Sequence, residues 1–435
     1  MFDSAFLARM LTPRGRILLM LAAATLLAGL GREAIVAATQ GVREFLRLPN
    51  DELAIAYGAY GFGLSLGLVL GGVLVELVGT GLGFLICGVV VTAATALTGF
   101  AWSLTILSIS RLALGLAAGA MLPAAAAVLA PWTPPRERGW NMGVVHAALA
   151  GGAVLAWPLI GLAGLSGAWR LGFLGIAGLG TVWAVSWMLW FQARPGEAGD
   201  TDGRAALPVH WRGAWRILLL PTVLALLQGW GMALCRDWVP RYLLLTWHFD
   251  VKLSSWISAA SGGAMVLGCL IGGVAADGSL NHSGNIRSAH QVVPGIGFLL
   301  AALSLMLLPI GENQLAIALW LSLALIGLQA AGIMLWVFAI DIGGKHTGIA
   351  AASIGLGMLV STLISPLDLF GLSPSAPAVV TITALVLAGI LSFWLRPHIE
   401  LPVLLPPAPE EKPPEDEAAA EIDALLETPK KKARA

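Results

Sequence analysis

Long apolar runs separated by short polar breaks fill most of the chain. Runs of about twenty residues are long enough for a helix to cross the hydrocarbon core of a bilayer. The runs show no two-residue alternation, which favours helices over a membrane barrel, because the backbone in lipid must satisfy its own hydrogen bonds. We therefore predict about twelve membrane-spanning helices. They cover residues 16–39, 53–76, 80–101, 104–130, 140–163, 169–192, 216–245, 254–276, 291–310, 314–340, 347–369 and 377–395.

Composition supports the same class of protein. Hydrophobic residues make up 57% of the chain and charged residues 11%, against roughly 25% charged in an ordinary soluble domain. A formal net charge of zero gives no reason to expect a nucleic-acid partner. Cys87, Cys235 and Cys269 lie inside apolar runs without disulfide or metal-ligand spacing, so we expect small core residues and no metal site or cofactor.

Lysine and arginine gather in alternate loops. One set holds Arg9, Arg14, Arg16, Arg136, Arg138, Arg194, Arg204, Arg212, Arg216, Arg287, Lys345 and Lys430 to Lys432. The other set holds only Arg43, Arg47, Arg170, Arg241 and Lys252. Because cationic loops are retained on the cytoplasmic side, the first set predicts that both termini are cytoplasmic in a multi-pass protein of the cell (inner) membrane.

The longest polar break between spans divides the chain into two halves. Residues 193–215 contain Pro195 and Gly196 and are typical of a flexible cytoplasmic linker. We expect one six-helix bundle over residues 1–192 and a second over residues 216–397. Residues 398–435 are rich in Pro, Glu, Ala and Lys and are expected to form a disordered cytoplasmic tail.

A short motif recurs in the two halves. Gly71, Gly72 and Val73 precede Glu76 at the end of the second span, and Gly272, Gly273 and Val274 precede Asp277 at the end of the eighth. These two segments resemble the signature loop that follows spans two and eight in the major facilitator superfamily, although the basic residues are missing after Gly79. In that family the loop locks helices together on the cytoplasmic face. The resemblance implies gating roles for Glu76 and Asp277.

Other stretches narrow the resemblance. Residues 111–123 and the loop 132–139, which reads Trp-Thr-Pro-Pro-Arg-Glu-Arg-Gly, look like the fourth span and following loop of the anion:cation symporters and the organophosphate antiporters. Residues 237–243 with His248 and Phe249 are similar to the seventh and eighth spans of the glycerol-3-phosphate antiporter group. The resemblance covers nearly all of the membrane domain and implies an all-α fold of twelve helices in two pseudo-symmetric bundles, with the substrate site between them.

Arg32 is the first candidate for that site. It lies about sixteen residues beyond Arg16, which at about 1.5 Å per residue places it above mid-membrane. A charge in the hydrocarbon core costs at least about 2.5 kcal/mol, so such residues usually face a pathway or a partner. The relatives hold an anionic substrate with an arginine here, and a guanidinium grips carboxylate or phosphate with two parallel hydrogen bonds. The alternative is a structural pair with Glu33 or with another helix, and the pair with Glu33 is disfavoured because neighbours on a helix point apart.

Arg236 is the candidate in the second half. It stands with Asp237 in span seven, the pseudo-symmetric counterpart of span one, so two arginines could approach one central anion. The organophosphate antiporters place their span-seven arginine about one turn earlier, where this chain has Met232. The alternative is a network of Arg236 with Asp237 near the periplasmic mouth.

Arg111 matches an arginine of the anion:cation symporters in span four and is a further candidate contact to substrate. Two acids of those relatives are replaced here by Gly31 and Ala118. Because protonatable carboxylates couple proton flux to anion movement, proton coupling by the usual residues is not expected. Glu33 is the candidate replacement if it faces the cavity.

Span centres offer two more candidates. His146 could titrate near neutral pH and contact a proton or an anion, and the alternative is a neutral, hydrogen-bonded structural histidine. Tyr60 and Trp336 are expected as walls of a cavity.

These residues predict a secondary active transporter that moves a small organic anion, either a sugar-acid carboxylate or an organophosphate, by alternating access. The expected partners are the substrate, the lipid bilayer and either protons or a counter-transported anion, and we expect a monomer. The alternative is a non-transporting sensor or scaffold on a transporter fold. An enzyme is not expected, because no nucleophile elbow or pair of catalytic carboxylates is evident.

Overall fold

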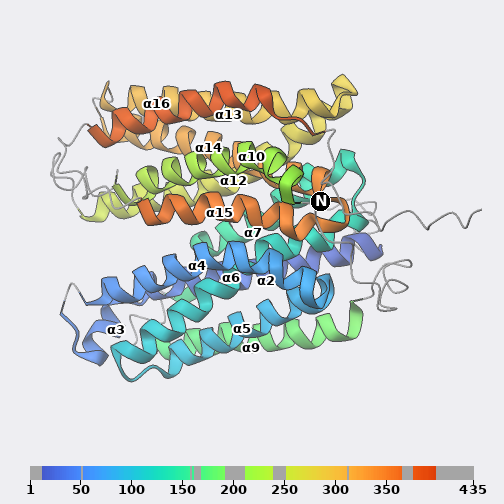
Figure 1. Cartoon of the computed structure of the whole chain (residues 1–435). Helices are drawn as coiled ribbons and strands as arrows, with labels where there is room; N and C mark the ends of the chain where they lie inside the picture. Colours follow the sequence, from blue (N-terminus) through green and yellow to red (C-terminus); the bar gives the residue numbers. More distant parts are fainter. Residues whose placement is uncertain are drawn as a thin grey trace, which may run out of the picture.

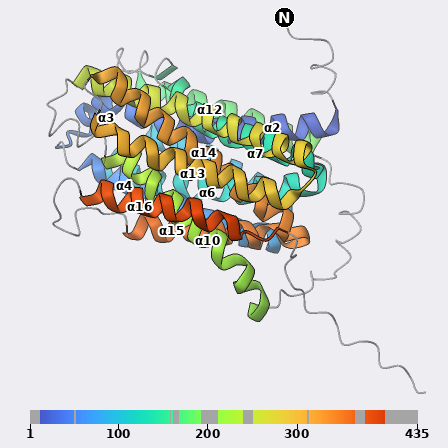
Figure 2. The same cartoon turned by 90° about the horizontal axis from the view of Figure 1, so that it is seen from above.

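The computed structural model describes residues 12–49, 52–156, 159–160, 168–191, 211–238, 251–310, 313–364 and 376–397. Within these ranges every regular element is a helix, and the long helices run roughly along one direction (Figures 1 and 2). Ten stretches are long and apolar enough to cross a membrane; one of them, Gln314–Ile364, holds two consecutive helices, and a shorter apolar stretch covers Ala378–Trp394. The prediction of an all-helical, multi-pass membrane protein is confirmed.

The helices of the N-terminal half begin and end close to the predicted spans, with the largest difference at α7, which ends at Ala156 where residue 163 was predicted. They are α2 (Pro13–Ala37), α4 (Leu53–Val78), α5 (Thr80–Phe100), α6 (Leu104–Trp132), α7 (Arg138–Ala156) and α9 (Trp169–Trp190). One element was not predicted. The short helix α3 (Thr39–Leu46) continues from α2 after a break at Ala38 and ends at Arg47, whose backbone is left-handed with φ 54°.

The C-terminal half contains the remaining helices. They are α10 (Trp211–Ala233), α12 (Val251–Ser283), α13 (Ile286–Leu307), α14 (Gln314–Gly343), α15 (Thr347–Ile364) and α16 (Ala376–Leu391). A π-helical turn, Leu234–Trp238, follows α10. The two halves of the chain lie side by side, with α4 and α7 of the first half next to α15 and α12 of the second (Figure 1).

Several helices begin where a polar side chain caps the free backbone N–H groups of the first turn. The hydroxyl of Thr12 accepts from Gly15 at the start of α2, and that of Ser103 accepts from Ile106 at the start of α6. Asn313 caps α14 in the same way, at 2.8 Å from the Ala316 nitrogen. These side chains satisfy donors that helix geometry leaves unpaired, which explains why the apolar runs become helical at these positions.

Glycines bring α4 and α6 together at backbone distance. Gly63, Gly67 and Gly71 recur every fourth residue on α4, and a Cβ atom added at Gly67 would lie 2.0 Å from the Leu116 carbonyl oxygen of α6. Gly115 on α6 faces α4 in return. Helices in a membrane associate through such small residues, because lipid provides no hydrophobic force between them.

The three cysteines are free and buried, as predicted for core residues. Most of the linker and the tail, as well as the motif that begins at Asp237, lie outside the residues whose side chains the structure describes.

Candidate functional site

The repeated glycine motif joins the two halves of the chain at the end of the molecule that the charge pattern predicts to be cytoplasmic. A Cβ atom added at Gly72 of α4 would lie 2.1 Å from the Gly348 carbonyl oxygen of α15. A Cβ atom added at Gly273 of α12 would lie 2.5 Å from the Gly139 carbonyl oxygen of α7. The second glycine of each motif therefore sits backbone to backbone against the first turns of a helix from the other half, whereas Gly71 and Gly272 face α6 and α14 of their own halves.

The acid of each motif contacts the start of that same helix. The carboxylate of Asp277 accepts hydrogen bonds from the backbone nitrogens of Gly139 at 2.8 Å and Trp140 at 2.7 Å. Glu76 lies 3.2 Å from the Nδ1 atom of His346, directly before α15. A negative charge at a helix N-terminus meets unpaired N–H groups and the positive end of the helix dipole.

A third cross-half contact involves residues that the sequence analysis did not select. Arg138 at the start of α7 donates to Asp341 near the end of α14. The other oxygen of Asp341 lies 2.6 Å from Nε2 of His290 on α13. The charge of Asp341 in an otherwise apolar run was the available signal. We call these three groups, Glu76–His346, Asp277 with the start of α7, and Arg138–Asp341–His290, the cross-half latch.

Arg32 and Glu33 form an ion pair, with 3.0 Å between Nε and Oε1. The expectation that neighbouring helix positions point too far apart to pair was wrong, because both side chains are long enough to bend toward each other. Both side chains are partly exposed, with 20% of the Arg32 side chain and 19% of the Glu33 side chain accessible. The Arg32 guanidinium also lies over the ring of Tyr60, 5.7 Å from its centroid. This group lies within helices α2 and α4, both long enough to span the membrane.

Arg111 is fully buried behind this group. Its guanidinium donates to the Gly31 carbonyl oxygen at 2.8 Å and to the Thr98 hydroxyl. It also lies over the ring of Phe173, 5.6 Å from the centroid. The side chain thus ties α6 to α2, α5 and α9, and it holds the residue that directly precedes Arg32.

His146 lies where α7 faces α14. Its ring centroid is 5.3 Å from that of Trp336, and its Nε2 atom is buried without a hydrogen-bond partner among the described residues. The hydroxyl of Thr25 donates to the carbonyl of the preceding residue, Val145, at 3.0 Å, which places His146 level with Thr25 of α2. Seven residues at about 1.5 Å each put it about 10 Å from Arg32 along the helix axes. The Tyr60 hydroxyl is likewise buried without a described partner.

Arg236 lies in the π-helical turn after α10 and is half-buried. Such turns break the regular helix and frequently occur at functional sites. The side chain of Asp237 falls outside the description. The pairing of these two residues, and a joint approach of Arg236 and Arg32 to one anion, both stay predictions.

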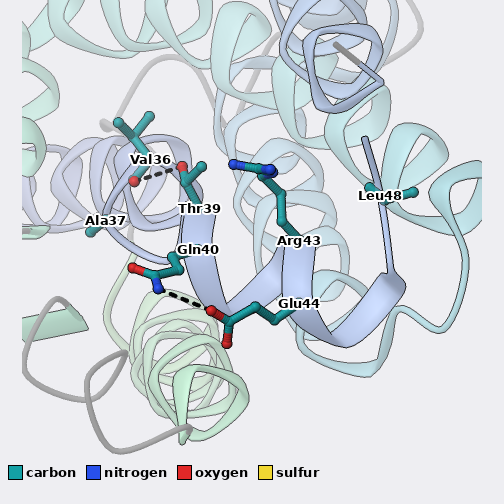
Figure 3. Close-up of a pocket in the computed structure, with 7 residues that line it drawn as sticks. All are labelled: Val36, Ala37, Thr39, Gln40, Arg43, Glu44 and Leu48. Carbon is teal, nitrogen blue, oxygen red and sulfur yellow. Dashed lines mark hydrogen bonds between the residues drawn. The ribbon is translucent and has the colours of Figure 1, made fainter. Parts of the chain in front are cut away.

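A depression of about 620 Å³ lies at the C-terminal end of α2, beside α3 (Figure 3). Its walls are Val36, Ala37, Thr39, Gln40, Arg43, Glu44 and Leu48. Gln40 donates to Glu44 at 2.9 Å, and Thr39 shares a hydrogen bond of 2.8 Å with Tyr57 (Figure 3 draws the first). This hollow lies beyond Arg32 along the helix, near the end of the molecule and away from its centre. We call it the mouth. No cluster of metal-ligating residues occurs in the described part of the chain.

Comparison with known proteins decides the family. The model of the Major Facilitator Superfamily matches residues 21–342. The chain belongs to this superfamily. It resembles a solved structure of a proton:xylose symporter of the major facilitator superfamily, with a TM-score of 0.67 and 14% identity over 87% of this chain and 95% of that one.

Several similar curated proteins are anion transporters by name. The chain is 25% identical over 340 residues to a probable sulfoacetate transporter of Cupriavidus necator, covering 75% of this chain and 79% of the relative. It is 27% identical over 270 residues to the galacturonate transporter of Dickeya chrysanthemi, covering 57% and 77%. A probable anion transporter of Arabidopsis thaliana is 25% identical, over 89% of this chain and 80% of the relative. Among major facilitator proteins, this chain is thus a relative of the anion transporters.

Proposed function

We propose that this protein is a secondary active transporter of small organic anions, with Arg32 as the residue that binds the anionic group. The observation that carries the proposal is the partly exposed side chain of Arg32 within a helix long and apolar enough to span a membrane. An arginine in that environment is costly unless it faces a pathway or a partner, and it binds planar anions through two parallel hydrogen bonds. Arg111 supports it by fixing the Gly31 carbonyl oxygen one residue earlier.

The polar groups around Arg32 favour a carboxylate or sulfonate over an organophosphate. Arg32, which lies over the Tyr60 ring, matches a singly charged group, because one planar guanidinium binds one carboxylate or sulfonate through two parallel hydrogen bonds. The Tyr60 hydroxyl and His146 Nε2 lack described partners, and a buried polar group without one is costly. Both could be satisfied by hydroxyl groups of a sugar acid. The names of the uronate and sulfoacetate transporters among the relatives support the same choice.

Transport would proceed by alternating access of two six-helix bundles, residues 1–192 and 216–397. In the described arrangement the halves are held together by the cross-half latch. Opening that end requires the Asp277 and Asp341 contacts to break. Binding drives such a change only if the anion binds one arrangement more tightly than the other.

We further propose that the latch end faces the cytoplasm. The positive charges on that side support this orientation, in which both termini, the linker 193–215 and the tail 398–435 lie in the cytoplasm and the helices cross an inner membrane. Protons or a counter-transported anion would accompany the substrate, and a monomer would suffice, since both halves of the site lie in one chain.

The test is ligand-induced thermal stabilisation of the purified protein against D-galacturonate, D-glucuronate, sulfoacetate, acetate, succinate and glycerol 3-phosphate. We expect uronates or sulfoacetate to raise the melting temperature of the wild type and of the control variant Arg43→Gln, which alters an arginine at the mouth. Arg32→Gln is expected to lose that shift. A wild type that no anion stabilises would contradict the proposed substrate class, and an unchanged shift in Arg32→Gln would remove Arg32 from the site.

A further inference from the structure

We infer that the cross-half latch contains one pH-sensitive contact, between His346 and Glu76, which tightens as the solution at that end of the molecule becomes more acidic. The contact joins the two halves of the chain, since Glu76 belongs to α4 and His346 to the turn Gly344–His346 before α15. The His346 Nδ1 atom lies 3.2 Å from Glu76 Oε2. No anion takes part in this contact, so it responds to pH whichever substrate the protein carries.

The three contacts of the latch differ in the donor that each acid uses. Asp277 accepts from two backbone N–H groups, which do not titrate. Asp341 is bound by Arg138, whose guanidinium stays charged at any physiological pH. Glu76 instead faces His346, and histidine is the side chain whose charge normally changes between about pH 5 and about pH 8. The contact at Glu76 is therefore the one whose strength can follow pH.

His346 is placed so that it can carry a second proton. Its Nδ1 atom faces the carboxylate of Glu76, and its Nε2 atom is not among the buried atoms that lack a partner in the described residues. Both ring nitrogens can therefore bear hydrogen without leaving a buried N–H group unpaired. The other oxygen of Glu76 lies at the first turn of α15, where a Cβ atom added at Gly348 would be 2.8 Å from it. The carboxylate is thus held beside the imidazole, and protonation turns their contact into an ion pair.

His290 of the same latch is arranged in the opposite way. Its Nε2 atom lies 2.6 Å from the second oxygen of Asp341, while its Nδ1 atom is buried without a partner in the described residues. A second proton on this ring would bury an N–H group that has no described acceptor, which costs more than a typical hydrogen bond contributes. The neutral ring, with its hydrogen on Nε2, already satisfies Asp341. His290 is therefore the matched control for His346.

The elements packed around His346 carry few groups that titrate. Helices α4, α6, α10 and α14 pack on α15, which directly follows His346. Their titratable and charged residues are Tyr57, Tyr60 and Glu76 of α4, Arg111 of α6, Arg212 and Arg216 of α10 and Asp341 of α14, with Arg138 and His290 bound to Asp341 and Lys345 next to His346. Helix α15 itself carries none over Thr347–Ile364. Within this set, the two histidines are the residues that normally change charge near neutral pH.

Protonation strengthens the closed latch, because a cationic ring adds a charge–charge attraction to the contact with the carboxylate. Opening separates His346 from Glu76 and loses that attraction. By linkage, the stabilisation is present at low pH and is lost as pH rises through the range in which histidines titrate. In the proposed orientation this end faces the cytoplasm, so acidification of the cytoplasm would hold the protein closed on that side.

The experiment is hydrogen exchange of the Gly139 and Trp140 backbone N–H groups, which donate to Asp277 while the latch is closed. Exchange is followed from about pH 5.5 to about pH 8.5 in the full-length wild type, His346→Gln, Glu76→Gln and the control His290→Gln. Each variant is compared with the wild type at the same pH, so that the intrinsic pH dependence of exchange cancels.

We expect both N–H groups to exchange about fivefold faster in His346→Gln than in the wild type at the acid end of this range, the factor that corresponds to one weak ion pair. The ratio should fall towards one at the alkaline end. Glu76→Gln, which keeps the histidine but removes its partner, should show the same decline with pH. His290→Gln should give one constant ratio at every pH.

A ratio that does not change with pH in His346→Gln and Glu76→Gln would overturn the inference, and so would a ratio that changes with pH only in His290→Gln. If His346→Gln does not fold, Glu76→Gln decides alone. Because the measurement contains no anion, failure of this pH response leaves the proposed role of Arg32 and the proposed function untouched.

Discussion

At the scale of single residues, Arg111 shows how a charge can be buried in a membrane protein without a carboxylate beside it. Transfer of a guanidinium from water costs several kcal/mol, and hydrogen bonds to polar groups offset part of this cost. Here the Gly31 carbonyl oxygen, the Thr98 hydroxyl and the Phe173 ring supply these contacts, and Nε has no partner within the described residues. Because the side chain is fully buried, we assign it a positioning role for Arg32 rather than contact with substrate.

Arg111→Lys should lower anion affinity by about tenfold or more, because a lysine keeps the charge but cannot hold the Gly31 carbonyl and Thr98 with one planar group. The melting temperature should also fall, because an ammonium is more strongly hydrated than a guanidinium and therefore costs more to bury. Anion titration and thermal unfolding in the same detergent check both expectations. Unchanged affinity in a folded Arg111→Lys would show that Arg111 does not position Arg32.

Tyr60→Phe separates the two proposed kinds of substrate. It removes a buried hydroxyl that lacks a described partner, so the empty protein should be as stable as the wild type or slightly more stable. D-galacturonate should lose affinity by about fivefold to tenfold, the worth of one hydrogen bond, while sulfoacetate, which has no hydroxyl group, should change by less than about twofold. The measurement is titration with both probes. An equal loss for both would indicate that Tyr60 serves the arginine rather than the sugar hydroxyls.

At the scale of the elements, the bounds of the helices were largely predictable. Apolar runs and caps such as Thr12, Ser103 and Asn313 mark them locally, and the helices agree with the predicted spans within a few residues for most elements. Two features were not predicted from the sequence. The short helix α3 is too polar to be recognised as an apolar run, and the π-helical turn at Leu234–Trp238 lies inside a stretch that was predicted as one continuous span.

Substitution of glycines in α4 tests whether α4 and α15 approach each other closely. Gly72→Ala should lower stability by about 1 to 3 kcal/mol, because its Cβ would lie 2.1 Å from a carbonyl oxygen of α15 and the two halves would have to shift apart. Gly61→Ala in the same helix meets nothing within 4 Å and should be neutral or stabilising by up to about 1 kcal/mol. Thermal unfolding of both variants checks this. Equal stability would mean that α4 and α15 do not meet at Gly72.

At the scale of the whole molecule, the cross-half latch closes one end of the structure. Glu76 and Asp277 could be selected from the sequence, because they repeat in equivalent positions of the two halves. Asp341 carried a signal as a charge in an apolar run, but the contacts that it, His290 and His346 make could not be predicted, since each partner lies on another helix and no local pattern records the pairing. The same limit applies to Arg111. The sequence identified it as a candidate site residue, but its burial against α2, α5 and α9 became evident only from the fold.

Opening of the latch can be followed with a native cysteine. Cys269 of α12 is fully buried and lies against Gly143 of α7, whereas Cys87 lies within the core of the N-terminal half. Asp277→Asn removes the charge at the start of α7, which should weaken the latch by roughly 1 kcal/mol or more. Cys269 should then react with a maleimide at least about fivefold faster, and Cys87 at an unchanged rate. Mass spectrometry of each cysteine distinguishes this outcome from general loosening, in which both cysteines react faster.

The most direct test of the account is uptake of D-galacturonate and sulfoacetate into vesicles reconstituted with the wild type, Arg32→Gln or the control Arg43→Gln. The account predicts saturable uptake by the wild type and by Arg43→Gln, and a kcat/KM at least about thirtyfold lower in a folded Arg32→Gln, because a charge-assisted hydrogen bond of about 2 kcal/mol or more is lost. Saturable uptake that Arg32→Gln leaves unchanged, or no saturable uptake of any organic anion by the wild type, would contradict it.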